Sequence, residues 1–139
     1  MIHKEKKTYL KDTETVELNI PNLADGEYHF AEIIWENEPI NSTALVKLAN
    51  EKLGWKKPTA YTVLRKLCEK GIMKNENAIV TSVIPREKIQ QSATIEFMSR
   101  NFHNSVPAFL AAFLKHKSLK QEEIKEIQQM LMEAEREDD

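Results

Sequence analysis

Apolar side chains recur every three or four residues along most of this chain, which is the spacing that gives a helix one buried face. The pattern predicts a first helix over residues 25–37 and a second from residue 42 to about residue 52, with Asn41 or Ser42 as the cap of the second. The side chains expected to face the core are Tyr28, Ala31, Ile34 and Trp35 in the first helix and Ala44, Leu45, Leu48 and Ala49 in the second.

A third helix is predicted over residues 58–70. Pro58 suits the first turn of a helix, and Gly71 suits the left-handed residue that follows one. A short turn containing Gly54 joins this helix to the preceding one, which makes a helix-turn-helix pattern. The inward stripe consists of Ala60, Val63, Leu64 and Leu67, and the residues left on the open face are Thr59, Tyr61, Thr62, Arg65 and Lys66.

Two short β-prone runs follow Gly71 and flank the polar turn at residues 75–77, which predicts a β-hairpin. Three helices followed by a hairpin are the elements of a winged helix. Upstream, the alternation of apolar and polar residues over 16–20 predicts a short strand. Residues 1–15 are interpreted as a flexible arm, and the alternative interpretation is a basic arm that lies on phosphates.

From Ile89 onward the pattern predicts three further helices, with a break at residues 104–107 and a capping box of Ser118 and Gln121 before the last. Their apolar stripes exceed what a monomeric tail can bury, so a partner is implied, and a second copy of the chain is the simplest one. The alternative is that these helices fold back on the winged helix. The candidate dimerisation residues are Phe97, Phe109, Leu110, Phe113, Leu114, Ile124, Ile127 and Leu131.

The fold class expected from these elements is mostly α with a small β-hairpin. Its parts are a flexible arm at residues 1–15, a winged-helix DNA-binding domain at 16–84 and a helical dimerisation domain at 85–139. With 41% apolar and 30% charged residues, the composition is typical of a helix-rich soluble protein. Neither a signal peptide nor an apolar run of membrane-spanning length is present, so the cytoplasm is the expected location and no membrane partner is expected.

Chemistry-bearing clusters are scarce in the sequence. Cys68 is the only cysteine and the four histidines are scattered, so no disulfide, metal site or cofactor is expected. No nucleophile–base constellation or glycine-rich phosphate loop is present, which argues against an enzyme and leaves no catalytic candidates.

The net charge of −2 includes one strongly basic segment and one strongly acidic segment. Residues 55–74 carry six basic side chains against Glu69, a balance of +5, whereas residues 118–139 carry three basic side chains against eight acidic ones, a balance of −5. A short helix with basic and polar side chains on its open face is what the major groove of DNA accepts. The net charge alone would argue against a nucleic-acid partner, but its distribution favours double-stranded DNA.

Three stretches resemble the penicillinase repressor family, the BlaI/MecI/CopY group of dimeric winged-helix repressors. They are LADGEYHFAEIIWENEPIN at residues 23–41, GWKKPTAYTVLRKLCEKGIMK at 54–74 and VPAFLAAFLKHKSLKQEEIKEIQQML at 106–131. The resemblance implies a cytoplasmic transcriptional repressor that binds a two-fold operator as a homodimer, with residues 58–70 as its recognition helix. The DNA-binding residues that it implies are Lys57, Thr59, Tyr61, Thr62, Arg65 and Lys66.

Departures from the family pattern limit the resemblance, and the first 15 residues have no clear family counterpart. The wing is short and carries Glu76, so wing contacts to DNA are in doubt and a winged-helix protein-interaction module is the alternative function. Glu96 precedes Phe97 where the family's protease-sensitive members have a neutral polar residue, so the regulatory protease or sensor is not identified. The paired C-terminal cysteines of the copper-responsive members are absent, which excludes sensing through copper–thiolate bonds.

Overall fold

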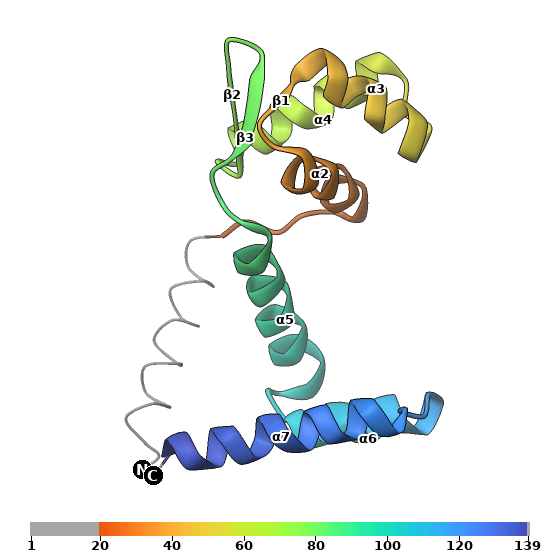
Figure 1. Ribbon diagram of the computed structural model, residues 1–139, viewed down its shortest axis with the longest axis vertical. Coiled ribbons are helices and arrows are strands. Elements are labelled where there is room, and N and C mark those ends of the chain that lie inside the picture. The colour runs from red at the N-terminus through yellow and green to blue at the C-terminus, as the bar shows by residue number, and fades with distance from the viewer. Residues whose placement is uncertain (1–19, 139) are drawn as a thin grey trace. The chain divides into compact units, whose positions relative to one another are not determined.

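The computed structural model describes residues 20–138, which divide into two compact units (Figure 1). The first comprises residues 20–90 and is called the winged unit; the second comprises residues 91–138 and is called the helical unit. The proposed arm at residues 1–15 and nearly all of the predicted strand at 16–20 lie outside the described residues. No helix in the described range is long and apolar enough to cross a membrane.

The winged unit contains three helices and a small antiparallel sheet. In chain order these are α2 (Asp25–Asn37), β1 (Ile40–Asn41), α3 (Ser42–Leu53), α4 (Lys57–Glu69), β2 (Met73–Glu76) and β3 (Ile79–Ser82), and the sheet order is β1-β3-β2. The predicted fold class, a winged helix followed by helices, is confirmed. The two-residue strand β1 was not predicted. It pairs with β3 through Ile40 opposite Val80, and so ties the start of α3 to the hairpin.

Local signals in the sequence explain where the helices begin and end. The Asn41 side chain caps α3 by accepting a hydrogen bond from the backbone N–H of Thr43 at 2.8 Å, as the sequence predicted. Gly54 and Gly71 have φ of 71° and 78°, the left-handed conformation that lets the chain turn after α3 and after α4. The third helix begins one residue earlier than predicted, at Lys57, and Pro58 still lies in its first turn.

The core of the winged unit is formed by α2, α3, α4 and the sheet. Its largest fully buried side chains are Phe30, Ile34, Leu45, Leu67, Ile72 and Val80. The prediction that Ala44 faces the core is wrong: this residue is exposed and Val46 is buried instead. The helix carries its buried stripe at Ser42, Leu45, Val46 and Ala49, so the inward face is rotated by part of a turn from the one expected.

The turn of the hairpin is shifted from the predicted position. Asn77 and Ala78 occupy the turn with φ of 53° and 64°, so two left-handed residues connect β2 to β3. Such a two-residue turn matches the twist of the strands that it joins. The prediction of a turn at residues 75–77 is therefore wrong by up to two residues, and Glu76 is the last residue of β2.

The helical unit contains the later part of α5 (Arg86–Phe102), followed by α6 (Val106–His116) and α7 (Gln121–Asp138). The break after α5 passes through His103 and Asn104, both with positive φ, and the Ser105 hydroxyl caps α6 by accepting from the N–H of Ala108. The predicted capping box of Ser118 and Gln121 is wrong. The helix begins at Gln121, and Glu123 accepts a hydrogen bond from the backbone N–H of Lys120.

Candidate nucleic-acid interface

The inner face of α4 anchors this helix in the winged unit. Ala60, Leu64 and Leu67 are 0%, 3% and 0% exposed, and the helix packs on α2, α3 and β2. Val63 is half-buried, so the predicted inward stripe is present with one member at its margin. Because α4 packs on three elements of the unit, its exposed face is held at the surface in a fixed orientation.

The structure separates the six predicted DNA-binding residues into two groups. Lys57, Thr59, Arg65 and Lys66 are exposed. Tyr61 and Thr62 are half-buried, and Tyr61 packs against the core cluster. The exposed group combines three cations with one hydroxyl, a set that can contact phosphates and base edges. Tyr61 has much of its ring committed to the protein itself.

The cations of α4 differ in whether the protein already uses them. Within residues 20–138, Lys57, Arg65 and Lys66 form no ion pair. Lys70, immediately after the helix, instead places its ammonium 2.8 Å from a carboxylate oxygen of Glu27 and donates to the backbone oxygen of Asn22. Lys70 therefore joins α4 to α2, while the other three side chains are exposed and without an ion pair to the described residues.

Glu27 is the centre of that link between α2 and α4. Its carboxylate accepts from the backbone N–H of Ala24 at 2.9 Å as well as from Lys70, and its side chain is only 12% exposed. Burial opposes ionisation, but these hydrogen bonds and the charges of Lys70 and Lys66 outweigh it and hold the pKa of the Glu27 carboxyl below its ordinary value of 4.5. The Glu27 carboxyl is therefore ionised at neutral pH, and its contact with Lys70 fixes the C-terminal end of α4.

The N-terminus of α4 is open toward the solvent. Among the residues that the structure describes, no side chain caps it; its first turn carries no acidic residue, and Lys56 and Lys57 lie at the first positions. Uncapped backbone N–H groups and the positive end of the helix dipole favour a bound anion. A phosphate group is the anion that a DNA backbone would present there.

A shallow hollow of about 370 Å³ lies between α4 and the wing, and its lining residues are Tyr61, Leu64, Arg65, Cys68 and Asn75. Burial, together with the neighbouring charge of Glu69, raises the pKa of the Cys68 thiol, so the thiol is protonated at neutral pH and is a weak nucleophile. Asn75, a neighbour of Arg65 in this hollow, was not predicted as part of the site. Alternation along β2 from the buried Met73 would have placed Asn75 on the side of α4.

The wing carries an acid that is paired within the wing itself. The Lys74 ammonium lies 3.6 Å from a carboxylate oxygen of Glu76, and both side chains are more than half exposed. The pair leaves the hairpin without a net charge of its own between Met73 and Ser82. The repulsion that Glu76 would exert on a phosphate is thereby reduced, although solvent screens such a pair and makes it weak.

The predicted dimerisation residues lie in the helical unit, and half of them are exposed. Phe97, Phe113, Leu114 and Leu131 are 48%, 40%, 45% and 62% exposed. The other four, Phe109, Leu110, Ile124 and Ile127, are half-buried. Phe109 contacts the rings of Phe97, Phe113 and Phe102, with centroids 5.6 to 6.3 Å apart. Phe102 was not among the predicted residues and completes this aromatic cluster.

Comparison with known proteins identifies the family. A family model described as penicillinase repressor matches residues 23–133. The chain belongs to the penicillinase repressor family. The match includes all of the elements from α2 to α6 and most of α7, so it covers the candidate interface and the aromatic cluster together.

Two relatives are similar to this chain at low sequence identity. The penicillinase repressor of Bacillus licheniformis is 25% identical over 118 residues, which are 82% of this chain and 92% of that protein. An uncharacterized 16.5 kDa protein from Latilactobacillus sakei is 26% identical over 117 residues, which are 81% of this chain and 80% of that protein. The similarity therefore extends over about four fifths or more of each protein, at low identity.

Proposed function

We propose that this member of the penicillinase repressor family is a transcriptional repressor that binds a two-fold operator in double-stranded DNA as a homodimer. The observation that carries the proposal is the outer face of α4, where Lys57, Arg65 and Lys66 are exposed and form no ion pair with the rest of residues 20–138. Charges left unpaired by the protein are available to phosphates.

The proposed roles follow from side-chain chemistry and position on α4. Lys57 and the uncapped N-terminus hold a phosphate, and Lys66 holds another along the helix. Arg65 contacts a guanine edge or a phosphate, and Thr59 and Thr62 contact a thymine methyl or donate a hydrogen bond to a base. Tyr61 plays a smaller part, as a phosphate hydrogen bond from its hydroxyl, because its ring packs on the core.

The proposed homodimer rests on the helical unit. The apolar helix α6 has no buried residue in the single chain, and exposed apolar side chains continue on α7 at Met130, Leu131 and Met132. A second copy that covers these surfaces would bury them without introducing any new chemistry. A symmetric dimer presents two copies of α4, and a two-fold operator is the DNA that matches them.

The test compares two double variants that remove the same charge. Arg65→Ala with Lys66→Ala alters α4, and Lys125→Ala with Arg136→Ala removes one lysine and one arginine from α7. Binding of the full chain to a random duplex is measured against salt concentration. We expect the α4 variant to flatten the logarithmic salt dependence by up to about 4 units per dimer, since each lost phosphate contact removes roughly 0.9 units. The α7 variant should bind as the parent does.

The same measurement distinguishes a DNA-binding repressor from the alternative, a winged-helix module that binds another protein. A protein-interaction module is favoured by Glu76, which is 70% exposed on the wing. Such a module would bind random duplex DNA weakly and without a steep salt dependence. An α4 variant that bound DNA as tightly as the parent would overturn the proposed interface, and a parent without affinity for any duplex would favour the module.

A further inference from the structure

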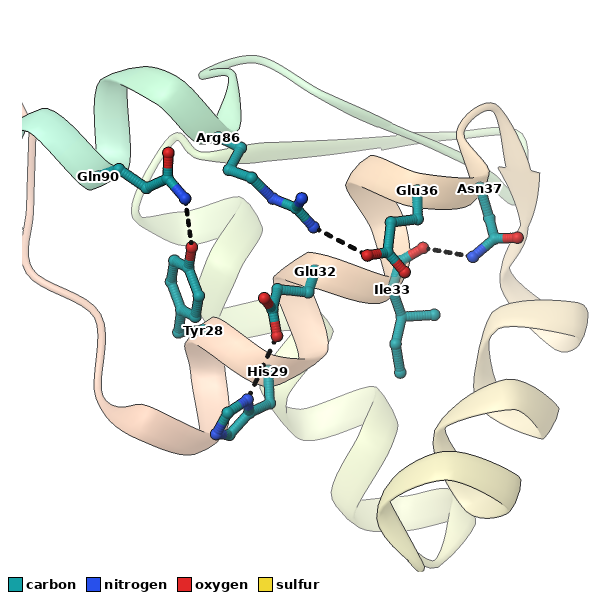
Figure 2. A network of polar contacts seen from close by, with 8 residues as sticks. All are labelled: Tyr28, His29, Glu32, Ile33, Glu36, Asn37, Arg86 and Gln90. Atoms are coloured by element: carbon teal, nitrogen blue, oxygen red, sulfur yellow. Dashed lines mark hydrogen bonds and ion pairs between the residues drawn. The ribbon is translucent and has the colours of Figure 1, made fainter. Parts of the chain in front are cut away.

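The first turns of α5 belong to the winged unit, although most of this helix continues into the helical unit. Ile89 is only 4% exposed and lies in the core cluster with residues of α2, α3 and α4. Figure 2 shows Arg86 and Gln90 reaching from α5 toward the side chains of Glu36 and Tyr28 on α2. The start of α5 is therefore attached to the winged unit by the buried Ile89 and by the polar contacts of Arg86 and Gln90 with α2.

Trp35 and Arg86 form the centre of this attachment. The Trp35 indole N–H donates to the backbone oxygen of Ile84 at 3.1 Å, which fixes the segment just before α5. The Arg86 guanidinium lies 5.6 Å from the centre of the Trp35 ring and donates to the Glu36 carboxylate at 3.1 Å. One side chain of α5 is thus held by a ring and by a carboxylate of α2.

A second contact lies about one turn further along α5. The Gln90 amide donates to the Tyr28 hydroxyl at 3.3 Å, and the Tyr28 ring packs edge-on against the ring of Trp35 at 5.7 Å. Two contacts separated by a helical turn restrain the direction of a helix, whereas one contact restrains only a point on it. We call this set of residues the α2–α5 clasp: Tyr28, Trp35, Glu36, Ile84, Arg86 and Gln90.

The chemistry of Arg86 suggests a positional role for the clasp. Its ion pair with Glu36 is partly exposed, with the two side chains 33% and 54% exposed, so solvent screening leaves it little stabilising effect. The Arg86 Nε is buried without a hydrogen-bond acceptor in the described part of the chain, which is unfavourable. An apolar side chain would cover Trp35 without that cost, so stability alone does not account for an arginine at this position.

We propose that the α2–α5 clasp sets the direction in which α5 leaves the winged unit, and thereby the separation of the two α4 helices that the dimer presents to DNA. This inference rests on the proposed function, because spacing matters only to a dimer that binds a two-fold site. Trp35 and Arg86 are then positioning residues for operator spacing. They act at a distance from the DNA, through α5.

The length of α5 turns a small change of angle into a large displacement. The helix has 17 residues without glycine or proline, so it is about 25 Å long and has no built-in kink. A tilt of about 10° at its first turn moves its far end by roughly 4 Å, which is close to the rise of one base pair along DNA. A dimer with a loosened clasp should therefore bind operators whose half-site spacings differ by about one base pair.

The test uses the full chain with Trp35→Phe and Arg86→Gln combined. These changes keep a ring and a long side chain, but remove the indole donor and the guanidinium. The matched control is Arg100→Gln, on the same helix, where Arg100 pairs with Glu96 outside the clasp. An operator is first selected from a random duplex pool with the parent chain. Affinity is then measured for that operator, for operators with one or two base pairs inserted between the half-sites, and for a single half-site.

The parent and the control should lose about tenfold or more in affinity when the spacing changes, because simultaneous binding of both half-sites is lost. The clasp variant should discriminate between the spacings by less than about threefold, with an unchanged affinity for the single half-site. A milder pair, Glu36→Gln with Gln90→Ala, leaves the core intact and should show the same effect in smaller form.

The other outcomes overturn the inference in distinguishable ways. If both clasp variants keep the spacing preference of the parent, the clasp does not set the spacing, and the repressor function stands. If their affinity for the single half-site falls as much as that for the operator, the clasp supports the fold of α4 instead. If the parent selects no two-fold site, the proposed function fails and this inference fails with it.

Discussion

The two units of this chain bury their apolar residues to very different degrees. In the winged unit, side chains from three helices, the sheet and the start of α5 form a continuous core with Phe30, Leu45 and Leu67 fully buried. In the helical unit, α6 carries two phenylalanines and two leucines among its 11 residues and has no buried residue. The hydrophobic effect acts on both units. The winged unit buries its apolar side chains within a single chain, whereas α6 leaves its own accessible to solvent.

This difference indicates what each unit needs in order to be stable. The winged unit should unfold with a free energy set by its own core and independent of protein concentration. The helical unit should gain its stability when a second copy covers α6 and α7, and so its unfolding should depend on concentration. The two tryptophans, Trp35 and Trp55, both lie in the winged unit, so their fluorescence reports on that unit alone.

The largest effect is expected from emptying the core of the winged unit. Phe30 is 0% exposed, and its ring stacks on Trp55 with centroids 5.4 Å apart. Phe30→Ala should lower the free energy of unfolding by about 3–5 kcal/mol, because it removes a large buried side chain and leaves a cavity. Denaturant unfolding followed by tryptophan fluorescence measures the change. Phe113→Ala is the matched control, and an equal shift from it would contradict the independence of the winged unit.

The next largest effect concerns the helical unit and its partner. Phe113→Asp places a charge on α6 in the proposed dimer interface, and should raise the Kd of the dimer at least about 30-fold, which corresponds to about 2 kcal/mol. Ile79→Asp makes the same change at a wing residue of similar exposure, 42% against 40%, and should leave the dimer intact. Sedimentation equilibrium measures both. A Phe113 variant that dimerised as the parent does would move the interface away from α6.

The two units also differ in how much of their structure the sequence revealed. The bounds of α2, the cap at Asn41 and the glycines after α3 and α4 were predictable, because each follows from local spacing or backbone preference. The strand β1 was not, because two residues are too few to show a period. The turn of the wing was misplaced because Ala78 adopts a left-handed conformation that alanine rarely takes, and strand pairing with β3 determines it.

For the candidate site, the sequence predicted which residues lie on α4, but not how much of each side chain is exposed and free of contacts within the protein. The cations Arg65 and Lys66 are exposed as the helical period implied, whereas Tyr61 lies at the edge of that face and packs inward. The contact of Lys70 with Glu27 joins residues 43 positions apart, and the hydrogen bonds of the clasp join residues 49 to 62 positions apart. Contacts at such separations depend on how the helices pack, and a local pattern carries no signal for them.

A smaller effect distinguishes the polar links of the two units. Glu27→Gln should lower the free energy of unfolding of the winged unit by about 1–2 kcal/mol, because Glu27 is mostly buried and accepts from both Lys70 and Ala24. Since the folded pKa of Glu27 is lowered, its contribution is present above pH 4.5 and is lost as the pH falls through the folded pKa. Parent and variant should therefore converge in acid when tryptophan fluorescence follows unfolding. Glu96→Gln, in the helical unit, should leave the tryptophan-detected transition unchanged; an equal loss there would show that the units are coupled.

The smallest effect is expected from reversing one acidic charge in each unit and measuring the affinity for DNA. Glu76 is 70% exposed on the wing and Glu133 is exposed on α7, so Glu76→Lys and Glu133→Lys make the same charge change in the two units. If the wing approaches the phosphates beside α4, Glu76→Lys should raise the affinity for random duplex about threefold at low salt and steepen the salt dependence by up to about 2 units per dimer. We expect the Glu133 variant to change neither, because α7 carries none of the proposed DNA-binding residues. Equal gains in affinity from both variants would mean that the net charge of the chain, rather than the position of the wing, governs binding. The proposal that the winged unit faces DNA while the helical unit dimerises would then have no electrostatic support.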